Sequence, residues 1–333
     1  MASKLSPYTL PDEVLPEVAL QARRKIARRV LPFIFLLYIV AYLDRANVAY
    51  AGLPMRAALG FSEAVFGFGA GVFFIGYFLL EIPGALIVER WSARRWLARI
   101  LVTWGICTCL VGLVRTPLKF YGARFLLGAA EAGFFPGIIV YLTHWFRAGD
   151  RARAMAGFVI AAPVALAFGA PLAALILRMN ALGLPGWRWV FILEGIPAVV
   201  LGVMTLYYLT DHPRHARWLT PGEREWIAGA LAAESRNKAG AGSLAWWRAL
   251  REPNVLLLTA AHFFACMAGY GFVLWLPNTL SKVLGFGPVA AALLSGLPFA
   301  AAIAAALLTG RSADRRGTPR RHAAAAMLCA AAC

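Results

Sequence analysis

Residues 30–51 read VLPFIFLLYIVAYLDRANVAYA, an apolar run long enough to cross a membrane. A helix rises 1.5 Å per residue, so about 20 residues span the roughly 30 Å hydrocarbon core of a bilayer. Seven more apolar segments follow, at about 66–88, 96–114, 118–140, 154–177, 189–209, 254–276 and 288–309. A ninth begins near residue 322 and reaches the final Cys333 after about 12 residues, too few to cross a bilayer. We therefore expect a truncated sequence that ends inside a helix.

Composition supports an all-α polytopic membrane protein. Hydrophobic residues make up 61% of the chain and charged residues 15%. A soluble domain has about 45–50% apolar and about 25% charged residues, so it could not bury this much apolar surface. The sequence has no CxxC or HExxH string, no phosphate-binding loop and no nucleophile–base set. We therefore expect no enzyme, no metal site and no cofactor.

The basic residues are distributed unequally between the two sides of the predicted bundle. With the N-terminus in the cytoplasm, 25 of the 33 Lys and Arg residues lie in inside segments and six in outside loops. Basic residues favour cytoplasmic loops, so this asymmetry predicts a cytoplasmic N-terminus in a multi-pass protein of the cell inner membrane. It also accounts for the net charge of +17 without a nucleic-acid partner.

An internal repeat predicts two halves. ALIVERWSARR (85–95) follows the second span, and GRSADRRGTPRR (310–321) follows the eighth, so acid, base and turn recur at the same place in each half. Between them, TPGE (220–223) predicts a capped helix over about 221–236. The predicted parts are a cytoplasmic N-terminal tail, a six-helix bundle, a cytoplasmic central loop and an incomplete C-terminal bundle, at residues 1–29, 30–209, 210–253 and 254–333.

Both loops resemble the G-x-x-x-D-R-x-G-R-R signature of the major facilitator superfamily, the second more closely than the first. YLDRANVAYA (42–51), RRWLARILVTWG (94–105), RFLLGAAEAGFFPGIIVYLTHWF (124–146) and GWRWVFILEGIPAV (186–199) resemble one branch, the anion:cation symporter family. The resemblance covers about residues 28–321. It implies twelve spans in two halves and proton-coupled uptake of organic anions such as tartrate, phthalate, hydroxyphenylacetate, nicotinate or sugar acids.

Charged residues inside the predicted spans mark a candidate site: Asp44, Arg45, Glu81, Arg124, Glu131 and Glu194. A charge at the bilayer centre costs at least about 2.5–3.5 kcal/mol, so such residues usually pair or line a polar path. Asp44 and Arg124 come to about the same depth, and Glu131 follows Arg124 by two turns on the same helix face. We expect Arg124 to bind a carboxylate in bidentate fashion and Asp44 and Glu131 to carry protons.

The resemblance implies the same roles for the Asp-Arg pair of the first span and for the Arg and Glu of the fourth. It makes Arg45 a substrate ligand and Tyr77 a hydrogen-bond partner of the substrate. Asn47, one turn after Asp44, can add another hydrogen bond.

A purely structural network is the alternative. In it, Asp44 neutralises Arg45 and Arg124 neutralises Glu131, and both pairs only fix the helices against each other.

The remaining polar residues are assigned to gating or helix contacts. Glu81 and Glu194 are expected in helix contacts or a gate, and the lone His144 and His262 at packing or interface positions. The repeated loops are expected to form a latch between the halves, made of Glu89, Arg90, Asp314, Arg315 and Gly317.

The sequence thus predicts a monomeric secondary transporter, working by alternating access, whose partners are a small organic carboxylate, protons and the lipid bilayer. A proton-driven exporter of the same superfamily is the first alternative, although 157–175 lacks the Gly-Pro pair usual in the fifth span of such exporters. A fragment that does not transport is the second, because an incomplete second half cannot complete alternating access.

The charge asymmetry generates a topology prediction. Cysteine labelling should place residues 1–28 and 210–253 in the cytoplasm and the 52–65 loop outside, because basic loops stay inside. An outside signal for 210–253 would contradict the two-half arrangement.

Overall fold

The computed structural model describes residues 17–239 and 251–332. Within these ranges the chain is helical, apart from loops and a two-stranded hairpin of β1 (Asn180–Ala181) and β2 (Leu184–Pro185). The helices are α1 (Glu17–Leu59), α2 (Glu63–Arg90), α3 (Ala93–Val111), α4 (Pro117–Glu131), α5 (Phe134–Thr143), α6 (Ala148–Val159), α7 (Ala161–Leu177), α8 (Gly186–Tyr208), η1 (Pro213–His215), α9 (Pro221–Ala239), α11 (Pro253–Leu284), α12 (Pro288–Leu294), α13 (Leu297–Arg316) and α14 (Pro319–Ala332).

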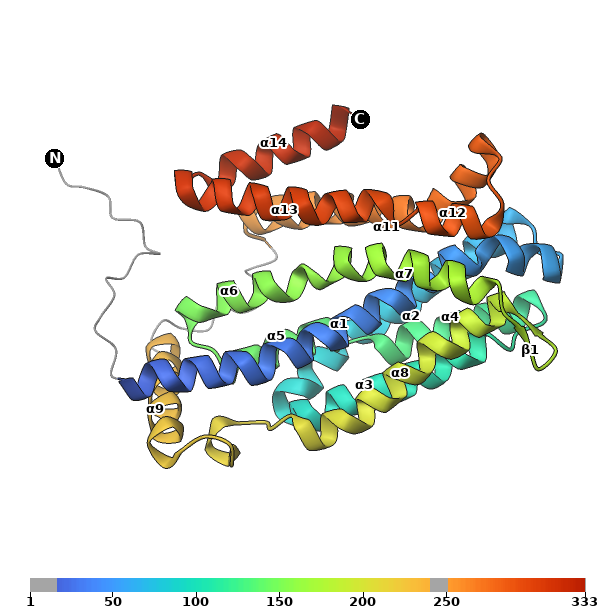
Figure 1. Cartoon of the computed structure of the whole chain (residues 1–333). Coiled ribbons are helices and arrows are strands. Elements are labelled where there is room, and N and C mark those ends of the chain that lie inside the picture. Colours follow the sequence, from blue (N-terminus) through green and yellow to red (C-terminus); the bar gives the residue numbers. More distant parts are fainter. Residues whose placement is uncertain (1–16, 240–250, 333) are drawn as a thin grey trace.

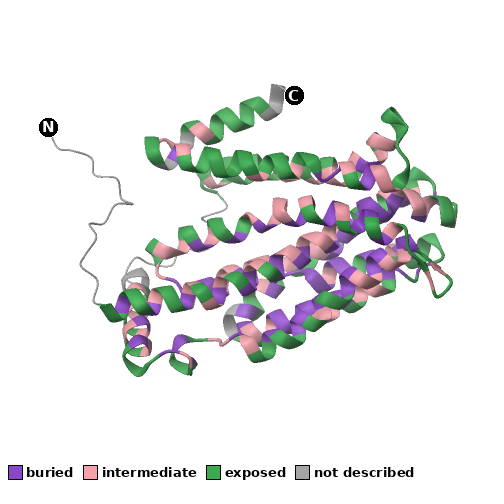
Figure 2. Ribbon diagram, viewed as in Figure 1, coloured by how far each residue is buried: buried purple, intermediate pink, exposed green. Residues whose placement is uncertain are grey.

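The helices from α1 to α8 form one bundle, with α2 packed along α4 and α3 packed along α8 (Figure 1). Helices α11, α12 and α13 lie on one side of this bundle, where they contact α1 and α7. Buried positions face the interior of the bundle, whereas α11, α13 and α14 are mostly exposed (Figure 2). Many of these exposed side chains are large and apolar, among them Leu257, Phe264 and Leu308. Such a surface is suited to lipid or to other apolar helices rather than to water.

Seven helical segments are long and apolar enough to cross a membrane. They confirm the predicted all-helical, multi-pass fold, but the predicted third span, at about 96–114, is not among them. That span corresponds to α3, whose 19 residues include Arg94, Arg95 and Arg99. Their charge lowers the hydropathy of the segment, although α3 packs along α8 within the bundle.

Three of the predicted spans each consist of two consecutive helices. The segment 118–140 is divided into α4 and α5, the segment 154–177 into α6 and α7, and the segment 288–309 into α12 and α13. The break between α6 and α7 falls at Ile160, three residues before Pro163. Proline has no backbone N–H, so it cannot complete the helical bond to the carbonyl of Val159.

Helix α9 begins where the capping pattern predicts. The Thr220 backbone N–H donates to Glu223 Oε2 at 2.8 Å, and the Glu223 backbone N–H donates to Thr220 Oγ1 at 3.3 Å. Glu223 Oε1 also lies 2.7 Å from Lys25 Nζ on α1. Burial acts to raise the pKa of Glu223, but the contacts with Lys25 and Thr220 outweigh burial and hold this pKa below its ordinary value. The capping box is thereby joined to the start of α1.

The lowered pKa of Glu223 generates a pH-dependence prediction. In Glu223→Gln the reciprocal cap is kept but the charged contact with Lys25 is lost, at a cost of about 0.3–1 kcal/mol, because the Lys25 side chain is exposed to solvent. We expect faster hydrogen exchange of the 221–239 backbone at neutral pH. Because the folded state favours the carboxylate, the stabilisation is present above the pKa of an unfolded glutamate and is lost as the pH falls through the lowered pKa.

The difference in hydrogen-exchange rate between Glu223→Gln and the wild type should therefore shrink on acidification. Glu225→Gln, which changes an exposed acid on the same helix, is the control and should exchange like the wild type. A difference between Glu223→Gln and the wild type that persists in acid would contradict the assignment.

Candidate functional site

The central cavity, of about 290 Å³, lies between the first bundle (α1 to α8) and α11. Aromatic side chains dominate its lining, with one arginine, one acid, one histidine and one cysteine among them. The lining residues are Tyr38, Tyr42, Arg45, Phe73, Phe74, Tyr77, Glu81, Phe135, His262, Cys266 and Tyr270. Cavities lined by apolar groups with a few convergent polar groups are typical of small-molecule sites.

Arg45 is the polar centre of this cavity. Its Nε donates to Glu131 Oε1 at 2.7 Å, and its Nη1 donates to the Tyr270 hydroxyl at 2.6 Å. The guanidinium also lies over the rings of Tyr77 and Tyr42, at 5.1 and 5.5 Å from their centroids. A cation over an aromatic face is attracted by the ring quadrupole. Arg45 therefore joins α1 to the end of α4 and to α11.

The position of Glu131 depends on a break in the fourth span. Glu131 is the last residue of α4, and Gly133 follows with φ +82°, a left-handed conformation that favours glycine. Pro136, in the first turn of α5, lacks the N–H that would bond to the carbonyl of Ala132. The predicted span at 118–140 is thus present as two helices that meet at this point. The break leaves the carboxylate of Glu131 at a helix end, where it meets Arg45.

A second polar cluster lies inside the first bundle, outside the cavity lining. Asp44 Oδ1 accepts a hydrogen bond from Asn47 Nδ2 at 2.9 Å. Asp44 interacts electrostatically with Arg124 on α4 and with Glu194 on α8, and Glu194 lies beside Asn47. All four side chains are buried. The sequence assigned Glu194 only to helix contacts or a gate, whereas the structure adds it to this cluster.

Several of these buried polar atoms have no hydrogen-bond partner in the described part of the chain. They are Asp44 Oδ2, Glu131 Oε2, both carboxylate oxygens of Glu194, and Nε and Nη1 of Arg124. The remaining Arg124 nitrogen, Nη2, donates to the Ala70 carbonyl at 3.5 Å, and its guanidinium lies over Phe73. Buried polar atoms normally form hydrogen bonds, so these atoms are exceptions. The carboxylate oxygens can therefore accept a proton, and the Arg124 nitrogens can bind a ligand, without the loss of an existing hydrogen bond.

The structure thus divides the predicted site residues into two groups. Arg45 and Tyr77 line the cavity, and Glu131 joins them through Arg45. Asp44, Asn47 and Arg124 belong to the buried cluster. The hydrogen bonds differ from the pairs of the structural alternative, because Glu131 accepts from Arg45 and Asp44 accepts from Asn47. Arg124 still interacts electrostatically with Glu131.

Sequence reasoning missed the contribution of α11. His262, Cys266 and Tyr270 line the cavity at intervals of four residues, which places them on one helix face. His262 was expected at a packing or interface position. The same four-residue spacing is visible in the sequence and could have identified this face.

The expected latch lies partly outside the described residues, since the side chains of Glu89, Arg90 and Asp314 are not described. Arg315 is exposed, and Gly317 follows α13 with φ +62°. The first repeated loop instead binds the segment after α8. Ser92 Oγ donates to Asp211 Oδ2 at 2.7 Å, and the Arg94 backbone N–H donates to Asp211 Oδ1 at 2.8 Å. The latch stays a prediction.

Comparison with known proteins identifies the family. The Major Facilitator Superfamily profile matches residues 34–333. A protein of Agrobacterium vitis, named provisionally as a tartrate transporter, is 44% identical over 92% of this chain and 71% of its own length. A quinolone resistance transporter of Acinetobacter baumannii is 38% identical over 88% of this chain and 68% of its own length.

The fold is shared with a solved transporter. The crystal structure of a bacterial homologue of the human lysosomal transporter Spinster superposes with a TM-score of 0.69 at 21% identity, over 90% of this chain. The chain spans 64% of the length of that transporter. At this identity the comparison shows the fold alone.

Close contact between α2 and α4 generates a stability prediction. A Cβ added at Gly128 would lie 1.9 Å from the Phe73 carbonyl oxygen, whereas one at Gly122 on the same helix meets nothing within 4 Å. Gly128→Ala must separate the helices and should cost about 1–3 kcal/mol. Gly122→Ala should be neutral or stabilising by about 0.5–1 kcal/mol, because alanine favours helix. Thermal unfolding in detergent measures both, and equal midpoints would contradict this contact.

Proposed function

The chain belongs to the Major Facilitator Superfamily of secondary transporters, and from that premise we propose that it takes up a small organic carboxylate together with protons across the inner membrane. The proposal includes a cytoplasmic N-terminus and alternating access between two halves. It assigns the chain no enzymatic step, in keeping with the family.

The observation that carries this proposal is the place of Arg45. It is the one arginine among the described residues that line the central cavity, and aromatic rings surround its guanidinium. A guanidinium stays charged at all physiological pH values and matches a carboxylate with two parallel N–H groups. An organic anion that enters the cavity meets this cation.

The contact between Arg45 and Glu131 supports coupling to protons. Arg45 Nε donates its hydrogen bond to Glu131 Oε1. A substrate carboxylate and the Glu131 carboxylate therefore compete for the same donor. When Glu131 takes up a proton, its charge no longer competes and Arg45 can turn to the substrate. Binding of the anion and of the proton then favour each other, as linkage requires.

Asp44 is the second proposed proton carrier. It is 1% exposed, and its Oδ2 has no hydrogen-bond partner among the described residues. Arg124 lies beside it as the nearby cation. In this proposal Arg124 is the cation that compensates the negative charge of the buried cluster. It becomes a substrate ligand only if helix movement opens a path to the cavity.

The tartrate transporter relative supports an organic anion as the substrate class. The quinolone resistance relative favours a second candidate, export of a compound by the same cavity. The direction of transport separates them. A proton gradient directed inward drives accumulation in an importer and depletion in an exporter.

Substitution of the two acids tests the coupling. In reconstituted vesicles, Asp44→Asn and Glu131→Gln should abolish accumulation of a carboxylate against its gradient but leave exchange, because the site can still bind without taking up a proton. Glu225→Gln, an acid on α9, is the control and should accumulate normally. Undiminished uphill uptake by both variants would show that the acids are structural.

Substitution of the two arginines tests the site. Arg45→Lys keeps the charge but loses the planar guanidinium with its two parallel N–H groups, so carboxylate binding should weaken strongly. Arg45→Ala should lose roughly 2–5 kcal/mol of binding free energy. Arg124→Lys should affect binding less, because Arg124 does not line the cavity. Monodispersity on size exclusion must be confirmed for each variant. Wild-type affinity for the carboxylate in Arg45→Ala, together with weak binding in Arg124→Ala, would make Arg124 the substrate ligand in place of Arg45.

A further inference from the structure

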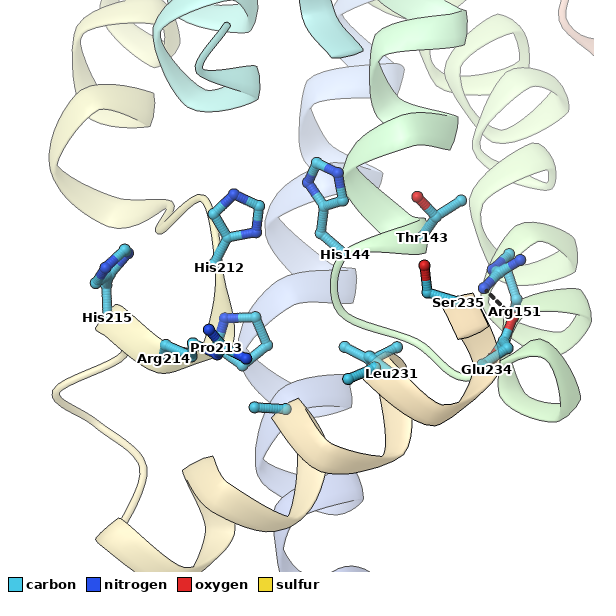
Figure 3. Close-up of a pocket in the computed structure, with 12 residues that line it drawn as sticks. Thr143, His144, Arg151, His212, Pro213, Arg214, His215, Leu231, Glu234 and Ser235 are labelled. Atoms are coloured by element: carbon cyan, nitrogen blue, oxygen red, sulfur yellow. Dashed lines mark hydrogen bonds and ion pairs between the residues drawn. The ribbon is translucent and has the colours of Figure 1, made fainter. Parts of the chain in front are cut away.

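A second cavity, of about 570 Å³, lies between the end of α5, the start of α6, the segment that holds η1, and α9 (Figure 3). It shares no lining residue with the central cavity. Its lining combines basic and hydroxyl side chains with a small apolar floor. The lining residues are Thr143, His144, Arg151, His212, Pro213, Arg214, His215, Ala228, Leu231, Ala232, Glu234 and Ser235.

Basic groups outnumber acids around this cavity. Among the described lining residues, Glu234 is the one carboxylate, against two arginines and three histidines. Glu234 Oε1 is bound by Arg151 at 3.1 Å, and its Oε2 accepts from the Ala148 backbone N–H at 2.9 Å. Its charge is therefore already matched within the wall. Arg214 therefore leaves the cavity with a surplus of hydrogen-bond donors and positive charge.

Three imidazole rings line the cavity, with His212 between the other two in sequence. The ring centroids of His144 and His212 are 4.8 Å apart, and those of His212 and His215 are 6.4 Å apart. Protonated rings at such distances repel each other unless an anion lies among them. No group of three His, Cys, Asp or Glu side chains within the described ranges is arranged to hold a metal ion. The cluster is thus better suited to an anion than to a cation.

The wall of the cavity is held in place before any ligand binds. The Thr210 carbonyl accepts hydrogen bonds from the Tyr141 hydroxyl and from Trp145 Nε1, each at 3.0 Å. These bonds fix the segment of His212 to α5, which ends beside His144. Pro213 is buried and starts the η1 turn, in which the His215 N–H donates to the His212 carbonyl at 3.1 Å. A preorganised site loses little entropy on binding.

We propose that this cavity binds a phosphate group, carried either by a soluble phosphate ester or by the headgroup of an anionic phospholipid. A tetrahedral phosphate offers oxygen acceptors in several directions, which suits imidazole, guanidinium and hydroxyl donors arriving from different segments. The cavity volume leaves room for more than the phosphate itself. Basic pockets at the ends of membrane helices are also known sites for phospholipid headgroups.

Variants at the rim test the proposal without disturbing the core, because His212, Arg214 and Arg217 are all exposed. Arg214→Ala and His212→Ala each remove one predicted partner. Arg217→Ala removes the same charge from the same segment but from outside the cavity lining, so it is the matched control.

The soluble probes are inorganic phosphate and glycerol 3-phosphate, measured by calorimetry on the purified chain in detergent. The lipid probe is a nanodisc of phosphatidylcholine with or without phosphatidylglycerol, and native mass spectrometry then measures retained phosphatidylglycerol. Loss of one charge-assisted hydrogen bond should weaken binding about tenfold to hundredfold in Arg214→Ala and His212→Ala, with Arg217→Ala like the wild type.

Binding of the soluble probes with this pattern supports a phosphate ester as the ligand. Retention of phosphatidylglycerol alone, with the same pattern, supports the lipid headgroup. Absence of binding by every probe overturns the proposal. Equal weakening by all three substitutions, or by none of them, overturns it too, because binding would then follow net charge or another surface.

Discussion

The hydrogen bonds from Arg45 to Glu131 and Tyr270 connect parts of the chain that lie far apart in sequence. Arg45 belongs to α1, Glu131 to the end of α4, and Tyr270 to α11, beyond the central segment. The side chain of Glu131 is fully buried and that of Arg45 is 12% exposed. A buried ion pair contributes little net stability, because desolvation offsets the Coulomb attraction. Removing one partner is nevertheless costly, so the pair constrains how these three helices meet.

This pair requires the break in the fourth span. A carboxylate at the C-terminal end of a helix faces the negative end of the helix dipole, which disfavours its charge. Glu131 therefore depends on Arg45 for compensation. Gly133 and Pro136 produce the break, and Gly128 brings α4 against α2, so three small or cyclic residues set the position of one acid. The local sequence of α4 and α5 thus determines the electrostatics of the cavity.

Much of the fold could be predicted from sequence because apolar runs and caps are local signals. The span positions and the Thr220–Glu223 capping box are of this kind. The pairings of the buried charges are not, because hydrophobic periodicity gives the depth of a residue but not its rotation about the helix axis. Arg124 and Glu131 share a helix face by spacing, yet Glu131 bonds to Arg45 on another helix. The place of Glu194 beside Asp44 and the bond of Tyr270 to Arg45 are of the same kind, since only tertiary contacts bring these residues beside α1.

Asp44 and Arg45 are neighbours, so their side chains leave α1 about 100° apart, one toward the buried cluster and the other toward the cavity. Together the cluster and the Arg45 pair contain three acids, Asp44, Glu131 and Glu194, and two arginines, Arg45 and Arg124. With all five charged, the acids exceed the bases by one. An organic anion that entered alone would enlarge this negative surplus in a low-dielectric interior, where uncompensated charge is costly. A proton taken up by any of the three acids offsets the added charge. Charge balance among these five side chains thus supports the joint movement of anion and proton that we propose.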